Sequence, residues 1–128
     1  MTGPFLLDTH ALIWALASPD RLRPAVRTAL ADSSVVVFVS AASAWEIAIT
    51  AALGKLPPPP DDLPDVLDRL GFDRLPVTIE DTLAVQSLPH HHRDPFDRLL
   101  VAQALRHGLT LVTADARLAE YGVATLVP

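Results

Sequence analysis

The sequence predicts an α/β domain with three layers, in which helices flank a central, mainly parallel sheet. Short apolar segments rich in strand-forming residues alternate with helical segments along the chain, which is the pattern of parallel sheets. Residues 35–39 (VVVFV) form an unbroken apolar run, as expected for a strand covered on both faces. A chain of 128 residues has the size of one compact core, so we expect a single domain over residues 1–128.

The first half of the chain is expected to contribute two strands and three helices. In order, these are a strand at 4–7, helices at 9–17 and 23–32, a strand at 35–39, and a helix that Ser40 caps and that ends at Leu53. Four prolines follow at 57–60, and we interpret them as a stiff polyproline-like loop rather than as a ligand for a proline-reading domain.

The second half is expected to continue the alternation. The sequence first predicts a helix at 61–71, a strand at 75–77 and a helix at 78–87. A helix then begins at Asp94-Pro95 and ends near His107-Gly108. A strand at 109–113, a helix at 116–120 and a strand at 123–127 follow. Thr78 and Asp81 are spaced as a capping pair at the start of one of these helices.

The composition limits both the location of the protein and the kind of metal site it can build. No cysteine occurs, so a metal would be held by carboxylate, imidazole, carbonyl or water ligands, which favours a hard cation such as Mg²⁺ or Mn²⁺. The first residues lack the basic flank and cleavage site of a signal peptide, and no apolar run approaches the roughly 20 residues that span a bilayer. We therefore expect a cytoplasmic protein with no membrane partner.

The net charge of -5 argues against binding nucleic acid through a general positive field, because nonspecific affinity comes mainly from Lys and Arg. Lys55 is the single lysine, and the other basic residues are arginines. Arginine favours forked contacts of defined geometry with phosphate. If RNA is the substrate, its binding must be local.

Two aspartates follow predicted strands, at the edge where open parallel sheets bind ligands. Asp8 comes directly after the strand at 4–7, and Asp115 comes shortly after the strand at 109–113. Both also precede helical segments, and aspartate is a favoured residue for capping a helix, so capping is the alternative role for each. The local sequence leaves both roles open.

Two further acids lie in helical segments. Glu46 is about two turns into an apolar helix, on a polar stripe with Ser43 and Thr50 that is either the solvated face or a face that lines a site. Asp94 is the clearest helix cap, and Asp97 is also explained as an acid favoured by the helix dipole. Several carboxylates close together repel one another, and a divalent cation removes that conflict.

Four segments resemble, in order and spacing, the signature blocks of bacterial PIN-domain proteins, in particular VapC-type ribonuclease toxins of type II toxin-antitoxin pairs. They are LLDTHALIWAL at 6–16, SAWEIAI at 43–49, HRDPFDRLLVAQAL at 92–105 and LTLVTAD at 109–115. The resemblance covers nearly the whole chain. It implies a PIN-like fold and Mg²⁺- or Mn²⁺-dependent endonucleolytic cleavage of RNA by a metal-activated water, with no covalent enzyme intermediate. It also implies a cognate antitoxin partner and a homodimer.

Carried over to this chain, the resemblance implies that four acids are both catalytic residues and metal ligands: Asp8, Glu46, Asp97 and Asp115. Thr9 and Thr113 stand beside these acids in the sequence. Their hydroxyls are predicted to hold a water or a carboxylate next to the metal, with capping of a turn as the alternative.

Other polar residues near these acids have two interpretations each. Arg98 is predicted either to meet a substrate phosphate or to pair with Asp94, one helical turn back. His90, His91 and His92 are interpreted as a solvated loop beside the site, because adjacent side chains point in different directions and rarely converge on one ion.

Other enzymes also place an aspartate after the first strand. A haloacid dehalogenase would need a second aspartate two residues after Asp8, where this chain has His10, and a receiver domain would need a lysine after a late strand, whereas Lys55 lies in mid-chain. Two alternatives stay open: a PIN fold that binds an antitoxin-like protein with little nuclease activity, and a housekeeping or DNA-directed nuclease. The presence of all four acids favours an active enzyme.

Overall fold

The computed structural model describes residues 1–57, 59 and 61–128, so the prediction for the proline run at 57–60 falls partly outside the described residues. The elements are, in order, β1 (Phe5–Leu7), α1 (Thr9–Ala17), the 3-10 helix η1 (Pro19–Arg21), α2 (Pro24–Ala31), β2 (Val37–Ser40), α3 (Ala41–Ala52), α4 (Leu63–Leu70), β3 (Asp73–Leu75), α5 (Ile79–Ala84), the 3-10 helix η2 (Val85–Ser87), α6 (Pro95–His107), β4 (Thr110–Val112), the 3-10 helix η3 (Ala116–Tyr121) and β5 (Thr125–Leu126).

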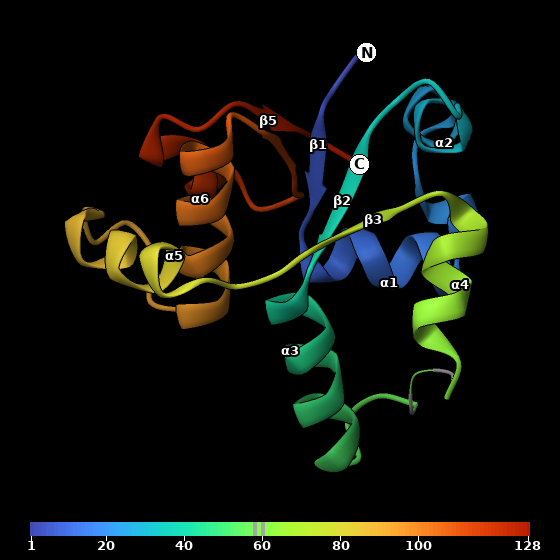
Figure 1. The fold of residues 1–128 in the computed structure, drawn as a ribbon, viewed down its shortest axis with the longest axis horizontal. Coiled ribbons are helices and arrows are strands. Elements are labelled where there is room, and N and C mark those ends of the chain that lie inside the picture. The colour runs from blue at the N-terminus through green and yellow to red at the C-terminus, as the bar shows by residue number, and fades with distance from the viewer. Residues whose placement is uncertain (58, 60) are drawn as a thin grey trace.

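The strands form one sheet in the order β3-β2-β1-β4-β5, in which all neighbours are parallel (Figure 1). β1 is the central strand, and its Leu6 is in register with Phe38 of β2 and Leu111 of β4. The chain adds strands to one side of β1 and then to the other, so the strand order reverses between β1 and β4. Open parallel sheets bind ligands at such a point, beyond the carboxyl ends of the strands.

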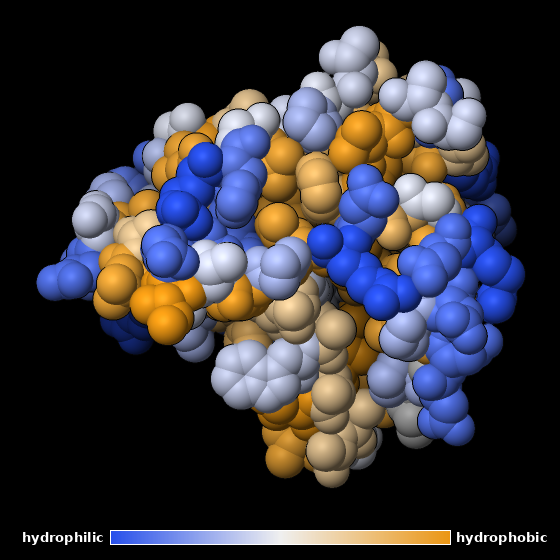
Figure 2. Space-filling model, viewed as in Figure 1, coloured by the Kyte–Doolittle hydropathy of each residue, from blue (hydrophilic) through white to orange (hydrophobic). Residues whose placement is uncertain are grey.

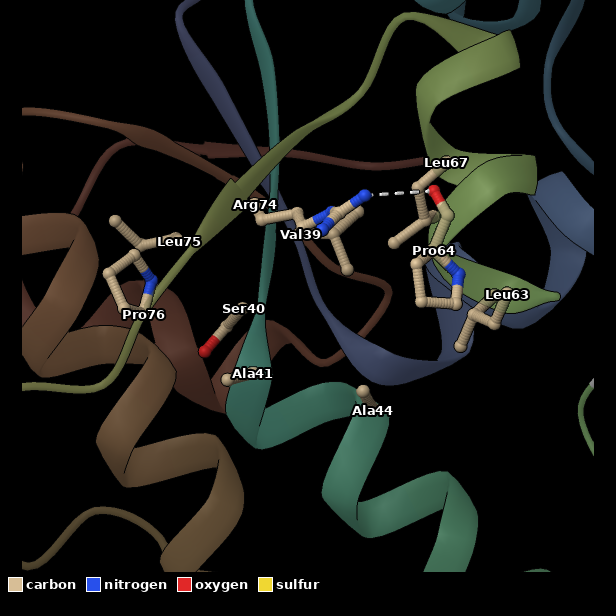
Figure 3. A pocket seen from close by; sticks show the side chains of 10 residues that line it. All are labelled: Val39, Ser40, Ala41, Ala44, Leu63, Pro64, Leu67, Arg74, Leu75 and Pro76. Carbon is tan, nitrogen blue, oxygen red and sulfur yellow. Dashed lines mark hydrogen bonds between the residues drawn. The ribbon is translucent and has the colours of Figure 1, made fainter. Parts of the chain in front are cut away.

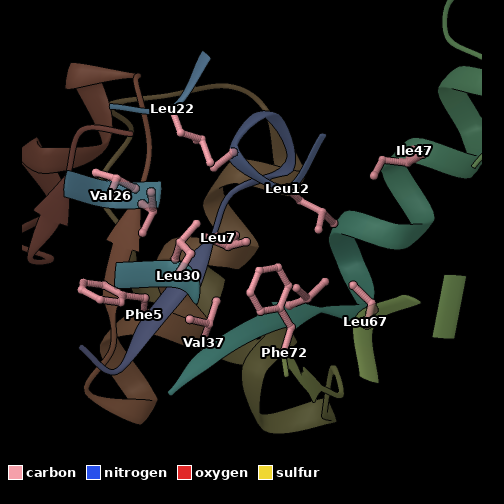
Figure 4. Packing of buried hydrophobic residues seen from close by; sticks show 13 residues of the cluster. Phe5, Leu7, Leu12, Leu22, Val26, Leu30, Val37, Ile47, Leu67 and Phe72 are labelled. Atoms are coloured by element: carbon pink, nitrogen blue, oxygen red, sulfur yellow. The ribbon is translucent and has the colours of Figure 1, made fainter. Parts of the chain in front are cut away.

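Helices cover both faces of the sheet, which confirms the predicted three layers. α1, α2 and α4 pack on one face, and α6 and η3 pack on the other, with α5 against α6 (Figure 1). Successive side chains of β1 point to opposite faces. Phe5 and Leu7 therefore join the first core (Figure 4), whereas Leu6 joins the second. The central strand is buried on both sides.

The ends of two helices follow the predicted local signals. At the start of α6 the Asp94 side chain accepts the N–H of Phe96, and the helix ends at Gly108, whose φ of 67° is left-handed and favours glycine. At the start of α5, Thr78 and Asp81 form a capping box in which each side chain accepts the other's backbone N–H. These predicted boundaries are confirmed.

The clearest differences from the predictions are in three strands and one helix. β5 occupies Thr125–Leu126 rather than 123–127. β2 starts at Val37 rather than at residue 35, because a turn comes first, in which Val35 donates its N–H to the carbonyl of Asp32. β3 occupies Asp73–Leu75 rather than 75–77, and it ends before Pro76, which has no N–H to donate to a neighbouring strand. The predicted helix at 116–120 is a 3-10 helix, the form that short helical segments often take.

Helix α3 extends beyond the carboxyl ends of the strands (Figure 1). Its exposed face is apolar, since Trp45, Ile49 and Leu53 follow one another at four-residue spacing and Trp45 is 62% exposed. Figure 2 shows mostly apolar side chains over the lower end of the molecule, where α3 lies in Figure 1. Among the described residues, no helix is both long enough and apolar enough to cross a bilayer.

Candidate active site

A cleft opens beyond the carboxyl ends of β1 and β4, where the strand order reverses. Its volume is about 450 Å³, and three of the four predicted acids line it. The helices α1, α6 and η3 all begin at this edge of the sheet. The lining residues are Asp8, His10, Trp14, His92, Asp94, Asp97, Ala114, Asp115 and Arg117.

Asp8 stands where β1 passes into α1. Its backbone N–H donates to the carbonyl of Val112 on β4 (3.0 Å), and its side chain accepts the N–H of Ala11 (2.8 Å) as the cap of α1. Burial raises the pKa of the Asp8 carboxyl group, against hydrogen bonds from Thr113 and Ala11 that lower it. Asp8 therefore caps a helix and lines the cleft at the same time, so the two roles that the sequence left open coexist.

Glu46 reaches this region from α3. The Thr9 hydroxyl donates a hydrogen bond to the Glu46 carboxylate, and the Ser43 hydroxyl oxygen lies 3.2 Å from that of Thr9. Ser43 is fully buried and Glu46 is half-buried. The polar stripe of α3 thus faces α1 rather than the solvent. Glu46 is not among the residues that line the cleft, so its role as a site residue stays a prediction.

Asp97 lies in the first turn of α6, three residues after its Asp94 cap. Burial is the main cause that raises the pKa of Asp97 to about 7, and repulsion from Asp94, Asp8 and Glu46 adds to it, while His92 opposes it. The acids that raise this pKa come from three different helices. Strongly perturbed carboxyl groups in a cleft are typical of functional sites.

Asp115 differs from the other acids because its oxygens are already covered by donors. Oδ1 accepts the backbone N–H and the Nε of Arg117, both at 3.0 Å, and Oδ2 accepts Nη2 of Arg117 at 2.8 Å and Nε2 of His92 at 2.9 Å. The Arg117 side chain in particular holds the pKa of Asp115 far below its usual range. A carboxylate has about four acceptor positions, so a cation would have to displace one of these donors.

His92 belongs to the site, and the sequence prediction of a solvated loop is wrong for this residue. Its side chain is 8% exposed, and its Nε2 lies 2.9 Å from Asp115 Oδ2 and 3.5 Å from Asp97 Oδ2. The N–H of Asp94 donates to His92 Nδ1 (2.9 Å), so the proton of the neutral ring is on Nε2. His92 is therefore a donor to the acids. Its position two residues before the cap of α6 is the signal that could have identified it.

Neither predicted role of Arg98 fits its position. The side chain is buried, and its guanidinium donates to the carbonyls of Pro89 (2.7 Å) and Leu88 (3.3 Å) and to the hydroxyl of Tyr121 (3.0 Å). These contacts fasten the segment before α6 to η3. One residue along a helix is a rotation of about 100°, so Arg98 points away from the cleft that Asp97 lines. Among the described residues its guanidinium is bound to carbonyl groups and the Tyr121 hydroxyl, not to Asp94.

The cluster has the chemistry of a divalent-cation site. One side-chain nitrogen or oxygen each of His92, Asp97 and Asp115 lies within 4.8 Å of the others, and Asp8 and Glu46 are close enough to act on the pKa of Asp97. Since both nitrogens of His92 are engaged in hydrogen bonds, the carboxylates are the candidate ligands. The raised pKa values of Asp8 and Asp97 reflect a burial and repulsion that a bound cation would relieve. Oxygen ligands of this kind suit Mg²⁺ or Mn²⁺.

A second hollow, of about 480 Å³, lies between α3, α4 and β3 (Figure 3). Its lining is mainly apolar and includes Val39, Leu67 and Leu75. Arg74 is the charged residue of the lining, and its guanidinium is already bound to the carbonyl of Pro64 (3.3 Å), as Figure 3 shows, and to a nearby aspartate. The hollow offers no group for acid-base or metal chemistry, so the catalytic candidates are in the acidic cleft.

Comparison with known sequences agrees with the resemblance of the four blocks. The sequence profile described as PIN domain matches residues 5–124. Ribonuclease VapC22 of Mycobacterium tuberculosis (strain ATCC 25618 / H37Rv) is 34% identical over 119 residues, which are 91% of this chain and 90% of that protein. Ribonuclease VapC16 of the same strain is 46% identical over 54 residues, which are 40% of this chain and 38% of that protein.

Solved structures show the same fold. FitAcB from Neisseria gonorrhoeae superposes with a TM-score of 0.63 at 24% identity, over 97% of each chain. FitAB bound to an IR36 DNA fragment superposes with a TM-score of 0.61 at 22% identity, over 95% of this chain and 93% of that chain. The profile match spans nearly the whole chain and the VapC22 match exceeds 30% identity. This chain therefore belongs to the PIN-domain family.

Proposed function

We propose that this protein is a metal-dependent endoribonuclease that acts as the toxin of a type II toxin-antitoxin pair, with residues 1–128 forming one nuclease domain. The observation that carries the catalytic part is the partly buried acidic cluster, in which burial and repulsion raise the pKa of Asp97 to about 7. The relation to two proteins named ribonucleases supports RNA as the substrate.

The acids differ in how readily they would hold a cation. We assign its direct contacts to Asp8, Glu46 and Asp97, whose oxygens are less fully covered than those of Asp115. Asp115, predicted as the fourth ligand, would have to give up a hydrogen bond from Arg117 or His92 to join them. When bound, Mg²⁺ or Mn²⁺ supplies Lewis acidity toward the phosphodiester and lowers the pKa of water.

Neighbouring side chains keep the acids in place. Thr9 donates to Glu46, Thr113 donates to Asp8, and His92 donates to Asp115 beside Asp97. The Thr113 hydroxyl also accepts the backbone N–H of Asp115 (3.1 Å). We propose that these contacts orient the carboxylates for the cation, as hydrogen bonds behind metal ligands commonly do.

The test is cleavage of a labelled single-stranded RNA by the purified protein, first in EDTA and then with Mg²⁺ or Mn²⁺. Cleavage is expected only with the ion. Asp97→Asn, purified in the same way, reveals contaminating ribonuclease and is expected to leave the RNA intact. Cleavage by this variant at the wild-type rate would overturn the proposed site.

The same experiment separates the other functions. A comparable rate on DNA would favour a DNA-directed nuclease. No cleavage of either polymer would favour a regulatory module that binds a partner. Cleavage-site mapping in cells identifies the RNA, since a metal-carboxylate site reads phosphate rather than sequence.

We further propose an antitoxin partner and a homodimer. The exposed apolar stripe of α3 (Trp45, Ile49 and Leu53) is a surface of the kind that protein partners cover. Light scattering of the purified protein measures the oligomeric state. A short upstream reading frame for a DNA-binding protein would support the toxin role, and its absence would favour a housekeeping nuclease.

A further inference from the structure

The cleft is acidic, whereas the proposed substrate is a polyanion. Four aspartates line it, and Arg117 is the one arginine or lysine in its described lining. The net charge of the chain is -5, so no general positive field compensates. A phosphate that enters this cleft therefore needs local positive charge in addition to the proposed metal ion, and Arg117 is placed to supply it.

Six of the other eight arginines are bound to groups away from the cleft, among them Arg23 to the Val127 carbonyl and Arg27 to Asp20. Arg98 is buried among carbonyl groups, and Arg106 pairs with the buried Asp81. Arg69 and Arg74 pair with acids of α4 or its cap, away from the cleft. These arginines therefore stabilise the fold and do not serve the cleft. Of the other two, Arg21 lies over the Trp14 ring, and Arg93 stands between His92 and Asp94 in the sequence.

The Arg117 guanidinium is bound to Asp115, but only some of its N–H donors are engaged. Its Nε and Nη2 bind the two oxygens of Asp115 in a fork, at 3.0 and 2.8 Å. Guanidinium has five N–H donors, so three are left for a ligand, and its Nη1 has no hydrogen-bond partner among the described residues. The side chain is 64% exposed, so a ligand can reach these donors.

We propose that Arg117 binds a phosphate of the RNA strand at the cleft and that Asp115 serves as its anchor. This inference rests on the proposed nuclease function and replaces Arg98 as the substrate contact. Arginine matches the geometry of phosphate with two parallel N–H donors. The carboxylate of Asp115 already fixes the orientation of the guanidinium, so little conformational entropy is lost when a phosphate binds.

The test compares Arg117→Gln and Arg117→Lys with Arg69→Gln, a control that removes the same charge from an arginine that is 66% exposed and pairs with Asp62 on α4's cap. Steady-state cleavage gives kcat and KM. Binding of a fluorescent single-stranded RNA to the Asp97→Asn background, at several salt concentrations, gives the salt dependence. Calorimetric titration with Mn²⁺ alone measures the affinity for the ion.

Arg117→Gln is expected to raise KM about 10-fold, the size of one lost hydrogen bond to a charged group. It should also reduce the slope of log affinity against log salt by about 0.7, which is one phosphate contact on a single strand. Arg117→Lys should keep most of the slope, Arg69→Gln should change neither quantity, and Mn²⁺ should bind the Arg117→Gln protein no more weakly than the wild type.

The outcomes separate this inference from the proposed function. If the wild type cleaves RNA while Arg117→Gln keeps its KM and salt slope, the inference is wrong and the nuclease function stands. If Arg117→Gln lowers kcat and Mn²⁺ affinity alone, Arg117 acts by orienting Asp115 for the ion, which also overturns it. A wild type that neither binds nor cleaves RNA would overturn both.

Discussion

Two carboxyl groups at opposite ends of helix α6, the half-buried Asp97 and the buried Asp81, have pKa values that shift in opposite directions. Asp97 lies in its first turn, where burial and neighbouring acids raise the pKa to about 7. Asp81 has no exposed surface and packs against the last turn, yet its pKa is lowered to about 2. Burial alone would raise both values.

The two pKa values differ because Asp81 is surrounded by hydrogen-bond donors and Asp97 is not. Asp81 accepts the N–H of Thr78 and the side-chain amide of Gln103 (3.0 Å), and it pairs with Arg106 and with His107 (3.4 Å). Asp97 has His92 at 3.5 Å and faces other acids. A buried carboxylate that accepts several hydrogen bonds stabilises the fold. A carboxylate surrounded by other acids is instead destabilised by repulsion, which a bound metal ion would relieve.

The largest expected effect is the loss of activity in Asp97→Asn. Cleavage should fall by more than ~100-fold, because replacing even a group that orients a metal ligand commonly costs 10- to 100-fold. Stability should stay the same or rise, since a repelled charge is removed. Steady-state cleavage and thermal unfolding measure the two effects, with Asp65→Asn on the exposed face of α4 as the control. A clear loss of stability would contradict the comparison.

Asp81→Asn is expected to behave in the opposite way. It should lower the free energy of unfolding by about 2–3 kcal/mol, because several buried donors lose their charged acceptor. The folded-state pKa lies below the ordinary value of 3.8, so the wild-type advantage is complete above pH 4 and is lost as the pH falls toward 2. Urea unfolding at pH 7 and pH 3 measures this. An unchanged stability at pH 7 would show that a neutral amide satisfies the donors around position 81 as well as the carboxylate does.

The raised pKa of Asp97 predicts a coupling between pH and metal binding. Its folded-state pKa exceeds the ordinary value of 3.8, so without metal the stability falls as the pH rises from about 4 to 7. Mn²⁺ reverses this loss. The rise in Tm on adding Mn²⁺ should be larger at pH 8 than at pH 5 by about 4 °C, or roughly 1 kcal/mol. The difference should shrink in Asp97→Asn, and an equal rise at both pH values would contradict the site.

The smallest predicted effect on cleavage is that of Thr9→Val, which keeps the shape of the side chain and removes the donor to Glu46. Cleavage should fall by about 10-fold, the lower end for a residue behind a metal ligand. Thr28→Val, on the exposed side of α2, is the control for the general effect of the change. Equal rates for the two variants would mean that Glu46 keeps its orientation without Thr9.

Local signals predicted most of the fold. The alternation of strands and helices, the Asp94 cap of α6 and the capping box of α5 depend on residues a few positions apart, so they can be recognised in the sequence. The ends of β2 and β3 could not be predicted in the same way. They depend on a turn and on hydrogen bonds to neighbouring strands, which become defined only when the sheet has formed.

The site was predictable to the extent that it follows strand ends. Asp8 and Asp115 were placed at one cleft by topology, and Asp97 by the blocks that resemble the family. His92 and Arg98 were misplaced because their environment comes from distant segments. Where the Arg98 side chain points depends on which face of α6 is turned toward the cleft. The contacts of His92 depend on Asp115, which lies on another element.

The position of β1 in the middle of the sheet has a consequence for how the protein is made. Asp8 lies in the first strand-to-helix turn, while Asp115 and Arg117 follow β4, the fourth strand in chain order. Synthesis proceeds from the N-terminus, so the central strand exists long before the residues that complete the cleft on its other side. A ribosome-bound or truncated chain that lacks its last two strands holds only part of the cluster. Any nuclease activity would therefore begin only after Asp115 and Arg117 have been synthesised and the cleft has formed beside β1.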